Sequence, residues 1–288
     1  MSIDKSTVPI RPRNIRFPID TVAEREWFDG DPLNTAYCDA LSVLFPQGER
    51  FFIQSVQHYA EHIDDPVLRQ AIRDFCIQEG FHTREHEAYN NRLVAEGIDL
   101  PAMEKRIAAT LGIIKTPIMQ LAITVAIEHL TATLGHVILG DNRLFAKAAE
   151  PYRDLWTWHA LEEVEHKGVA YDVFLEVTKG LSRWKRYMLR CTAMFTVTTI
   201  LHRIQLIHFI AILRHRGHST SLRTRARFFW SLFGIPGFYR KGLIYYLRIY
   251  LPGFHPWKGD DGSLARSARD RFDQLARVDN VINQTDIR

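Results

Sequence analysis

Cysteine is scarce in this chain of 288 residues, and its three copies lie far apart. Cys38, Cys76 and Cys191 form no Cys-x-x-Cys pair, so neither a disulfide framework nor a zinc–thiolate site is expected. Residues 1–20 contain no apolar stretch of the kind that a secretory signal requires. Together these absences predict a protein whose catalytic part works in the reducing cytoplasm.

The alternation of polar and apolar residues that marks a β-strand is also missing, so the sequence predicts an all-α protein. Hydrophobic residues make up 46% and charged residues 24% of the chain, which excludes a disordered polypeptide. Pro and Gly breakers divide the helical pattern after an extended arm. The expected helices, the first interrupted near Pro46, cover residues 32–63, 66–95, 103–111, 117–139, 151–178, 187–213, 221–233, 236–250 and 262–280.

Acidic residues are absent from residues 183–259, which hold fourteen Lys or Arg and fifteen aromatic residues. The rest of the chain has 23 basic and 33 acidic side chains. A mainly acidic N-terminal part therefore precedes a basic, aromatic region at 183–259. Basic side chains beside Trp and Tyr are typical of surfaces that meet anionic lipid headgroups. We interpret this region as a membrane-docking surface at the inner face of the cell membrane. A second helical layer that only covers the bundle is the alternative.

Two other readings of the basic region are less favoured. Residues 187–213 are long and apolar enough to span a membrane, but charged and polar side chains interrupt them, namely Arg190, His202, Arg203 and Gln205. Nucleic acid is not an expected partner, because no recognised binding motif is present and the apolar content is high.

Two Glu-x-x-His pairs are the main candidates for metal ligands in the sequence. They are Glu79 with His82 and Glu163 with His166. Residues three apart share a helix face, so each pair directs two ligands to one point. Glu49 precedes the first pair and Glu128 precedes the second, each on the preceding helix.

This order of four helices with Glu, Glu-x-x-His, Glu and Glu-x-x-His is the pattern of the two-metal carboxylate bundles. Four carboxylates neutralise two divalent cations, and one imidazole for each metal suits iron. The alternative is that these are ordinary exposed helix charges. Glu128 argues against it, because a carboxylate in the apolar segment 123–130 needs a partner.

His159 lies on the same helix face as Glu163 and His166. Over about residues 40–175 the ligand order therefore resembles the arylamine N-oxygenase family of di-iron enzymes, which adds a histidine in the order His-x-x-x-Glu-x-x-His. That resemblance implies seven metal ligands, Glu49, Glu79, His82, Glu128, His159, Glu163 and His166, with the four glutamates as catalytic residues. A histidine beside the site or at the surface is the alternative for His159. The whole chain, including Leu-Pro-Gly-Phe-His-Pro-Trp at 251–257, looks more like a bacterial family labelled predicted metal-dependent hydrolase.

Several neighbouring residues have open roles. His86 is an outer metal ligand, a hydrogen-bond partner of a ligand carboxylate or an exposed histidine, and Glu162 is a geometric alternative to Glu163. Glu165 is expected to be solvated. The remaining assignments place Asp172 in solvent, His58 and His62 at the surface or in packing, His255 in a tight turn, and small residues beside Glu128 that either leave room for substrate or permit close packing, at Thr124, Thr131, Ala132 and Gly135.

The sequence thus predicts a ferritin-like four-helix bundle with an additional C-terminal helical region. Its expected parts are an N-terminal arm (1–30), the di-metal bundle (31–182) and the basic aromatic region (183–288). The expected cofactor is two Fe ions, with Mn or Zn as alternatives. The expected function is a di-iron oxidase or oxygenase that takes dioxygen, an apolar small molecule and an unidentified electron donor. The alternatives are a metal-dependent hydrolase and a non-enzymatic iron-binding protein, and a second copy of the chain is a candidate partner.

Overall fold

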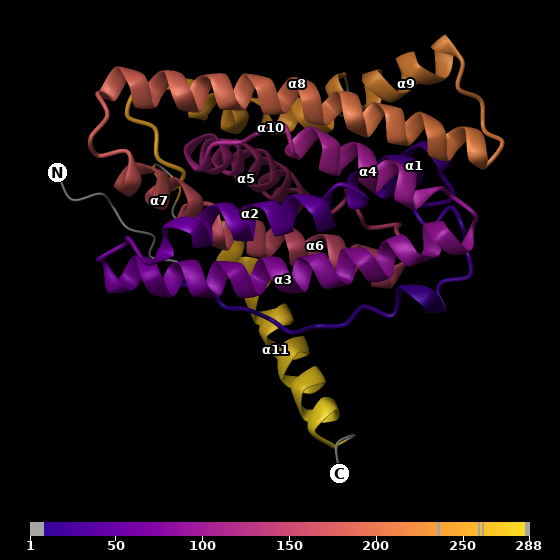
Figure 1. Ribbon diagram of the computed structural model, residues 1–288. Coiled ribbons are helices and arrows are strands. Elements are labelled where there is room, and N and C mark those ends of the chain that lie inside the picture. The colour runs from indigo at the N-terminus through magenta and orange to yellow at the C-terminus, as the bar shows by residue number, and fades with distance from the viewer. Residues whose placement is uncertain (1–8, 235–236, 259, 261, 286–288) are drawn as a thin grey trace.

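The chain is built from helices (Figure 1). This computed structural model describes residues 9–234, 237–258, 260 and 262–285, and in that part of the chain no β-strand occurs, only a single bridge between Phe28 and Ala148. The all-α prediction is therefore confirmed. The α-helices are α1 (Pro32–Ser42), α2 (Phe45–Ala60), α3 (Pro66–Ala95), α4 (Leu100–Leu111), α5 (Pro117–Gly140), α6 (Glu150–His166), α7 (Val169–Val177), α8 (Arg183–His215), α9 (Leu222–Phe233), α10 (Phe238–Leu247) and α11 (Ser263–Thr285), with short 3-10 turns at Ile19–Thr21 and Arg248–Tyr250.

Four helices, α2, α3, α5 and α6, form a bundle in which α2 packs on α3 and α5, and α6 packs on α3 and α5. Local sequence sets where two of the neighbouring helices begin. Asp31 and Asp65 precede prolines at the first helical position, and their side chains accept hydrogen bonds from the free N–H groups of α1 and α3. The cap at Asp65 thus fixes the start of α3, the helix that carries Glu79 and His82.

Two predicted helices are divided in the structure. The segment 32–63 breaks before Phe45 and Pro46, where a proline suits the first turn of a new helix. The segment 151–178 breaks at Gly168, between α6 and α7. A Cβ atom at Gly168 would lie 2.8 Å from Nε1 of Trp257, so the distant indole occupies the space that a side chain there would need. The uninterrupted helix predicted for 151–178 was therefore wrong at Gly168, a position at which Trp257 leaves no room for a side chain.

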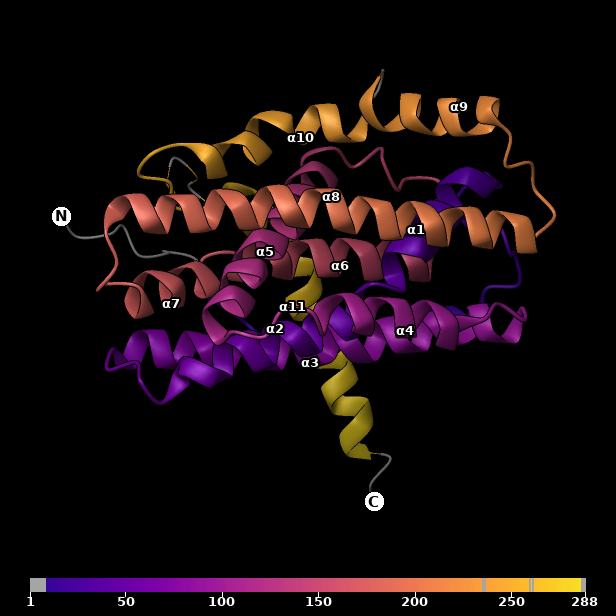
Figure 2. The same ribbon diagram turned by 45° about the horizontal axis from the view of Figure 1, so that its top comes forward.

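An outer layer of α8, α9 and α10 covers the side of the bundle opposite α3 (Figures 1 and 2). α8 packs on α1 and α5, and α10 packs on α5 and α9. Two helices, α5 and α8, are long and apolar enough to cross a membrane by composition alone. In α5, 78% of the apolar window is buried inside the protein, as expected for the central helix of a bundle.

The N-terminal arm and α11 pack against α6. Ile15, Phe17 and Trp27 of the arm join Phe272 of α11 and Trp158 of α6 in one apolar cluster. The three-part division of the chain stays a prediction.

Candidate metal centre

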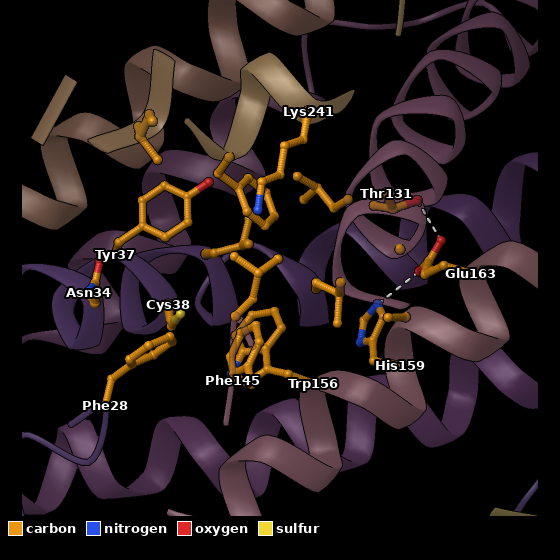
Figure 3. A pocket seen from close by; sticks show the side chains of 18 of the residues that line it. Phe28, Asn34, Tyr37, Cys38, Thr131, Phe145, Trp156, His159, Glu163 and Lys241 are labelled. Atoms are coloured by element: carbon orange, nitrogen blue, oxygen red, sulfur yellow. Dashed lines mark hydrogen bonds and ion pairs between the residues drawn. The ribbon is translucent and has the colours of Figure 1, made fainter. Parts of the chain in front are cut away.

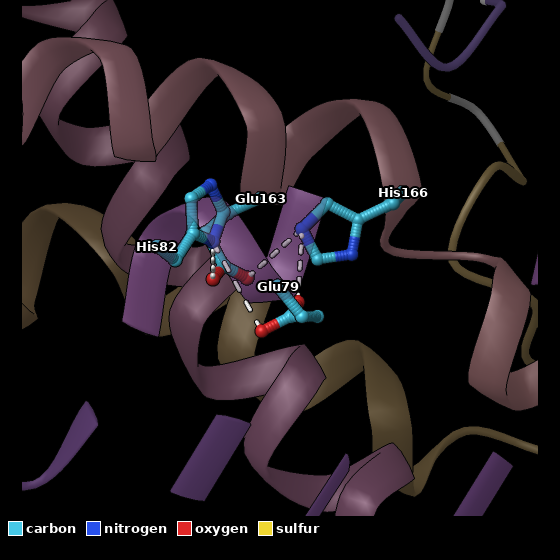
Figure 4. A group of neighbouring side chains, drawn as sticks. All are labelled: Glu79, His82, Glu163 and His166. Carbon is cyan, nitrogen blue, oxygen red and sulfur yellow. Dashed lines mark ion pairs between the residues drawn. The ribbon is translucent and has the colours of Figure 1, made fainter. Parts of the chain in front are cut away.

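All seven predicted ligands converge inside the bundle. Their side chains are buried, and they come from α2 (Glu49), α3 (Glu79 and His82), α5 (Glu128) and α6 (His159, Glu163 and His166). One group unites Glu79, His82, Glu163 and His166, with one ligand atom of each within 4.8 Å of the others (Figure 4). A second group unites Glu49 and His159 with His86 at the same spacing.

Glu79 and Glu163 lie between the two histidines of the Glu-x-x-His pairs. Glu79 Oε1 is 3.4 Å from His166 Nε2, and Glu79 Oε2 is 4.0 Å from His82 Nδ1. Glu163 is 3.8 Å from each of the same two nitrogens, one carboxylate oxygen toward each. Both carboxylates therefore occupy positions from which they could bridge two cations (Figure 4).

Glu128 and Glu49 lie at the sides of this group. Glu128 Oε2 is 3.3 Å from His166 Nδ1. Glu49, on α2, lies within 4.8 Å of a ring nitrogen of His159. Glu128 near His166 and Glu49 near His159 could therefore each bind a single cation, as a site for two separate cations would require.

His159 is held in a chain of hydrogen bonds. Its Nε2 is 2.8 Å from Glu163 Oε1, and its Nδ1 is 2.8 Å from His86 Nε2. His86 Nδ1 in turn lies 2.9 Å from the hydroxyl of Ser42 on α1. His86 is thus buried, which excludes an exposed histidine, and its observed partner is His159 and not a carboxylate. Its place beside Glu49 and His159 leaves the role of an outer ligand open.

A buried ionic network surrounds the centre. Glu162 does not point at the other carboxylates: it hydrogen-bonds Nε2 of His82 at 3.2 Å and Arg13 at 3.2 Å. This contact fixes the ring of His82 so that Nδ1 faces Glu79 and Glu163. Glu165, expected in solvent, is instead buried and accepts hydrogen bonds from Arg13 and Arg269.

The site contains more carboxylate charge than the protein itself pairs. Burial raises the pKa of Glu49 and of Glu79 well above the usual range, and that of Glu128 to about 7. Burial would raise the pKa of Glu163 as well, but His166 and His159 lower it. For His166, burial favours the neutral ring, yet Glu128 and Glu163 raise its pKa to about 9. The cluster therefore favours added positive charge.

Unpaired atoms give the clearest test of whether a metal fits. Within the described part of the chain, neither carboxylate oxygen of Glu49, Glu79 or Glu128 has a hydrogen-bond partner, and the same holds for Nδ1 of His82 and both ring nitrogens of His166. Buried polar atoms normally have hydrogen-bond partners, and a buried polar atom without a partner costs free energy. Divalent cations would satisfy all of these atoms at once, so this donor set fits metal ions.

A cavity of about 320 Å³ opens onto one side of the centre (Figure 3). Thr131, His159 and Glu163 form its inner end, and the Thr131 hydroxyl donates a hydrogen bond to Glu163. Most of its wall is apolar, with Phe28, Cys38, Leu41, Phe45, Leu134, Ile138, Leu144, Phe145, Trp156 and Phe238. Such a wall suits an apolar ligand placed against Glu163 and His159.

The small residues beside Glu128 divide between the two expected roles. Thr131 and Gly135 line the cavity. A Cβ atom at Gly135 would also lie 2.7 Å from the Ala160 carbonyl oxygen, so this glycine lets α5 and α6 pack closely. Thr124 hydrogen-bonds Ser55 on α2 at 2.7 Å and ties two bundle helices together.

The residues farther from the centre lie as follows. His58 and His62 are exposed, as expected. His255 accepts a hydrogen bond from the Trp257 N–H within its turn and bonds Asp172, which is only partly exposed. Sequence reasoning missed Arg13 entirely, because nothing in a polar, proline-containing arm marks one arginine as buried.

The fold and the donor set together define the class of the protein, a helical bundle with a buried metal-binding site. The chain belongs to the family described as predicted metal-dependent hydrolase, whose pattern matches residues 11–260. The matched region includes residues 11–30 of the arm, the bundle and the outer layer. Neither the curated proteins nor the solved structures that were compared contain a match to this chain.

Proposed function

We propose that this protein is a di-iron oxidase or oxygenase that acts on an apolar small molecule. One observation carries the proposal: buried carboxylates and histidines from four helices, many of their polar atoms without a hydrogen-bond partner, face one another beside a mostly apolar cavity. Two Glu-x-x-His pairs with two further glutamates form the ligand set of the di-iron and di-manganese bundles.

The proposed ligands divide by position. Glu79 and Glu163 would hold both ions, because each reaches toward both histidines. Glu128 and His166 would hold one ion, and His82, with Glu49 and His159 close by, the other. Bound iron would supply electrons for the reduction of dioxygen.

The protein's own groups prepare the site for that chemistry. The Glu162 contact keeps Nδ1 of His82 directed inward, and the Thr131 hydroxyl keeps Glu163 in place at the cavity end. The apolar wall holds the substrate against Glu163 and His159 and excludes water from a reactive centre. A site for redox chemistry benefits from this exclusion, whereas hydrolysis requires water.

Hydrolysis is the second candidate, favoured by the description of the family to which the chain belongs. A two-metal site can polarise a carbonyl or phosphoryl oxygen and lower the pKa of bound water. The same residues would hold zinc or manganese in that case.

Metal loading distinguishes the two candidates. Metal-free protein is loaded with iron(II) without oxygen and then mixed with air-saturated buffer in an oxygen electrode, with the iron oxidation state followed by Mössbauer spectroscopy. We expect oxygen uptake by the native chain and by Glu176→Gln, a substitution in α7, and little uptake by Glu79→Gln. Ester or phosphoester hydrolysis by the zinc-loaded protein under nitrogen, with no oxygen uptake by the iron-loaded protein, would establish the hydrolase instead.

A further inference from the structure

The outer surface of α8, α9 and α10 is unusually apolar for a surface. Trp184 at the start of α8 is 67% exposed, and Trp230 on α9 is 65% exposed. Ile244 on α10 and Leu222 on α9 are each 82% exposed. Further exposed apolar side chains of the same three helices are Met188, Phe195, Ile200, Phe229, Phe233, Leu243 and Leu247. We call this surface, with its Lys and Arg residues, the docking face.

Cations without acidic partners accompany these side chains. Within the described residues, the following exposed side chains of α8 and α9 have no ion pair: Arg183, Lys185, Arg203, Arg214, Arg223 and Arg227. No Asp or Glu occurs between residues 183 and 259, so α8, α9 and α10 themselves contribute only positive charge. The carboxylates that pair with Lys241 and Arg216, such as Asp141 and Glu96, come from other parts of the chain. Exposed tryptophans beside unpaired cations complement the interface of an anionic lipid bilayer.

The packing of α8 on the bundle favours a helix that lies flat on such a surface over one that spans it. The inner side of α8 is buried against α1 and α5, through Met194, Val197, Phe209 and Ile212 among others. α8 could enter a bilayer as a span only by giving up this packing. A helix buried on one side and basic and aromatic on the other lies in the plane of the interface.

A second cavity, of about 440 Å³, opens beneath the docking face between α8 and the α9–α10 pair. Exposed Phe229, Phe233 and Leu243 line its outer part. Three residues, Tyr37, Leu134 and Leu232, line both this cavity and the cavity at the metal centre, so their side chains form the wall between the two. The Tyr37 hydroxyl lies 2.9 Å from the hydroxyl of Tyr239 on α10, which ties this shared wall to the outer layer.

We propose that the docking face binds an anionic lipid membrane and that an apolar substrate dissolved in the lipid enters through the outer cavity. It then passes Tyr37, Leu134 and Leu232 to reach the cavity at Glu163 and His159. The membrane part stands on exposure and charge alone, whereas the passage of substrate rests on the proposed function.

Vesicle sedimentation tests the membrane part. The full chain is mixed with vesicles of phosphatidylcholine or of phosphatidylcholine with phosphatidylglycerol. We expect sedimentation with the anionic vesicles only, weakened about tenfold or more in the double variant Arg223→Glu/Arg227→Glu and in Trp184→Ser/Trp230→Ser. The matched control is Arg69→Glu/Val67→Ser on α3, on the opposite side of the bundle, which should bind as the native chain does.

Two results would overturn the membrane part. One is equal binding by the docking-face variants and the α3 control. The other is no binding to vesicles together with a dimer, seen by light scattering, that the Trp184→Ser/Trp230→Ser variant dissociates, since a second copy would then cover this face.

A photoreactive probe tests the passage without any metal. Vesicles carrying a diazirine-labelled long-chain alcohol are irradiated with bound protein, and the labelled peptides are identified by mass spectrometry. We expect label on the inner cavity wall, for example at Ile138 or Phe145, and its loss in Leu232→Trp but not in Leu232→Met. Tyr37→Phe, which releases the contact with Tyr239, should increase the inner label.

The tryptophan variant is informative only when folded, which retained vesicle binding and an unchanged circular dichroism spectrum verify. Label confined to the docking face in the native chain and in Tyr37→Phe would overturn the passage. Because neither measurement needs metal, a failed oxygen-uptake experiment would leave these results standing, and the reverse also holds.

Discussion

Arg13 illustrates how much of this site depends on a residue far away in sequence. It is almost fully buried, and its guanidinium binds Glu165 through two hydrogen bonds and also reaches Glu162 and Asp273. Glu162 in turn contacts His82. An arginine of the N-terminal arm therefore compensates the charge of carboxylates that lie next to the proposed ligands.

The substitution Arg13→Met tests this role. It would leave Glu162 and Glu165 buried with one cation fewer, and breaking a buried ion pair from one side typically costs about 3–5 kcal/mol. We expect a loss of this size in the free energy of unfolding, measured with urea. The control Arg16→Met removes an exposed arginine of the same arm that also contacts a glutamate, Glu85, and should cost about 1 kcal/mol or less.

The carboxylates of the centre should destabilise the metal-free protein. Burial and the neighbouring carboxylates Glu128 and Glu163 raise the pKa of Glu79, so its charge is unfavourable without a cation. We therefore expect Glu79→Gln to melt at a higher temperature than the native chain in the presence of a chelator and to gain less stability from added metal. Melting curves with and without iron(II) or manganese(II) measure both effects, and Glu176→Gln should change neither. A lower melting temperature in chelator would contradict this account.

Single ligands were predictable where a short-range pattern sets them. The three-residue spacing of Glu79 with His82 and of Glu163 with His166 directs each pair to one point, and the structure brings both pairs together. Glu165 was assigned to solvent wrongly, because its partners Arg13 and Arg269 are 152 and 104 residues away. No local pattern contains such contacts.

At the scale of elements, the break between α6 and α7 has a testable cause. A side chain at Gly168 would collide with the indole of Trp257. We expect Gly168→Ala to destabilise the protein by about 1–3 kcal/mol through this overpacking, with a shifted tryptophan emission. Gly180→Ala, where a Cβ would contact nothing within 4 Å, is the matched control and should be nearly neutral. Equal stability of the two variants would show that Trp257 does not exclude a side chain at residue 168.

Helix positions followed from the sequence where local signals were strong. Asp65-Pro66 starts α3 and Ala95 ends it, as the capping pattern predicts. The start of α4 was predicted three residues late, since Pro101 belongs to its first turn and does not precede the helix. The contact of Trp257 with Gly168, where the helix predicted for 151–178 is divided, joins distant parts of the chain and could not be seen locally.

At the scale of the whole molecule, bound metal should cross-link four helices and stabilise the folded state. The proposed ligands come from α2, α3, α5 and α6, so a ligand that binds only the folded state stabilises all four together. We expect chelation to lower the melting temperature and to speed amide hydrogen exchange in these helices more than in α11. Uniform exchange changes, or none, would argue against a centre shared by the four helices.

The central claim is that this chain binds a pair of metal ions through these side chains. Elemental analysis of protein purified from iron-supplemented cells, with the metal counted per chain, tests it most directly. The account predicts about two iron ions per chain and a large loss in Glu79→Gln and Glu163→Gln, but none in Glu176→Gln. Metal-free native protein, or a metal content that is the same in all three variants, would contradict it.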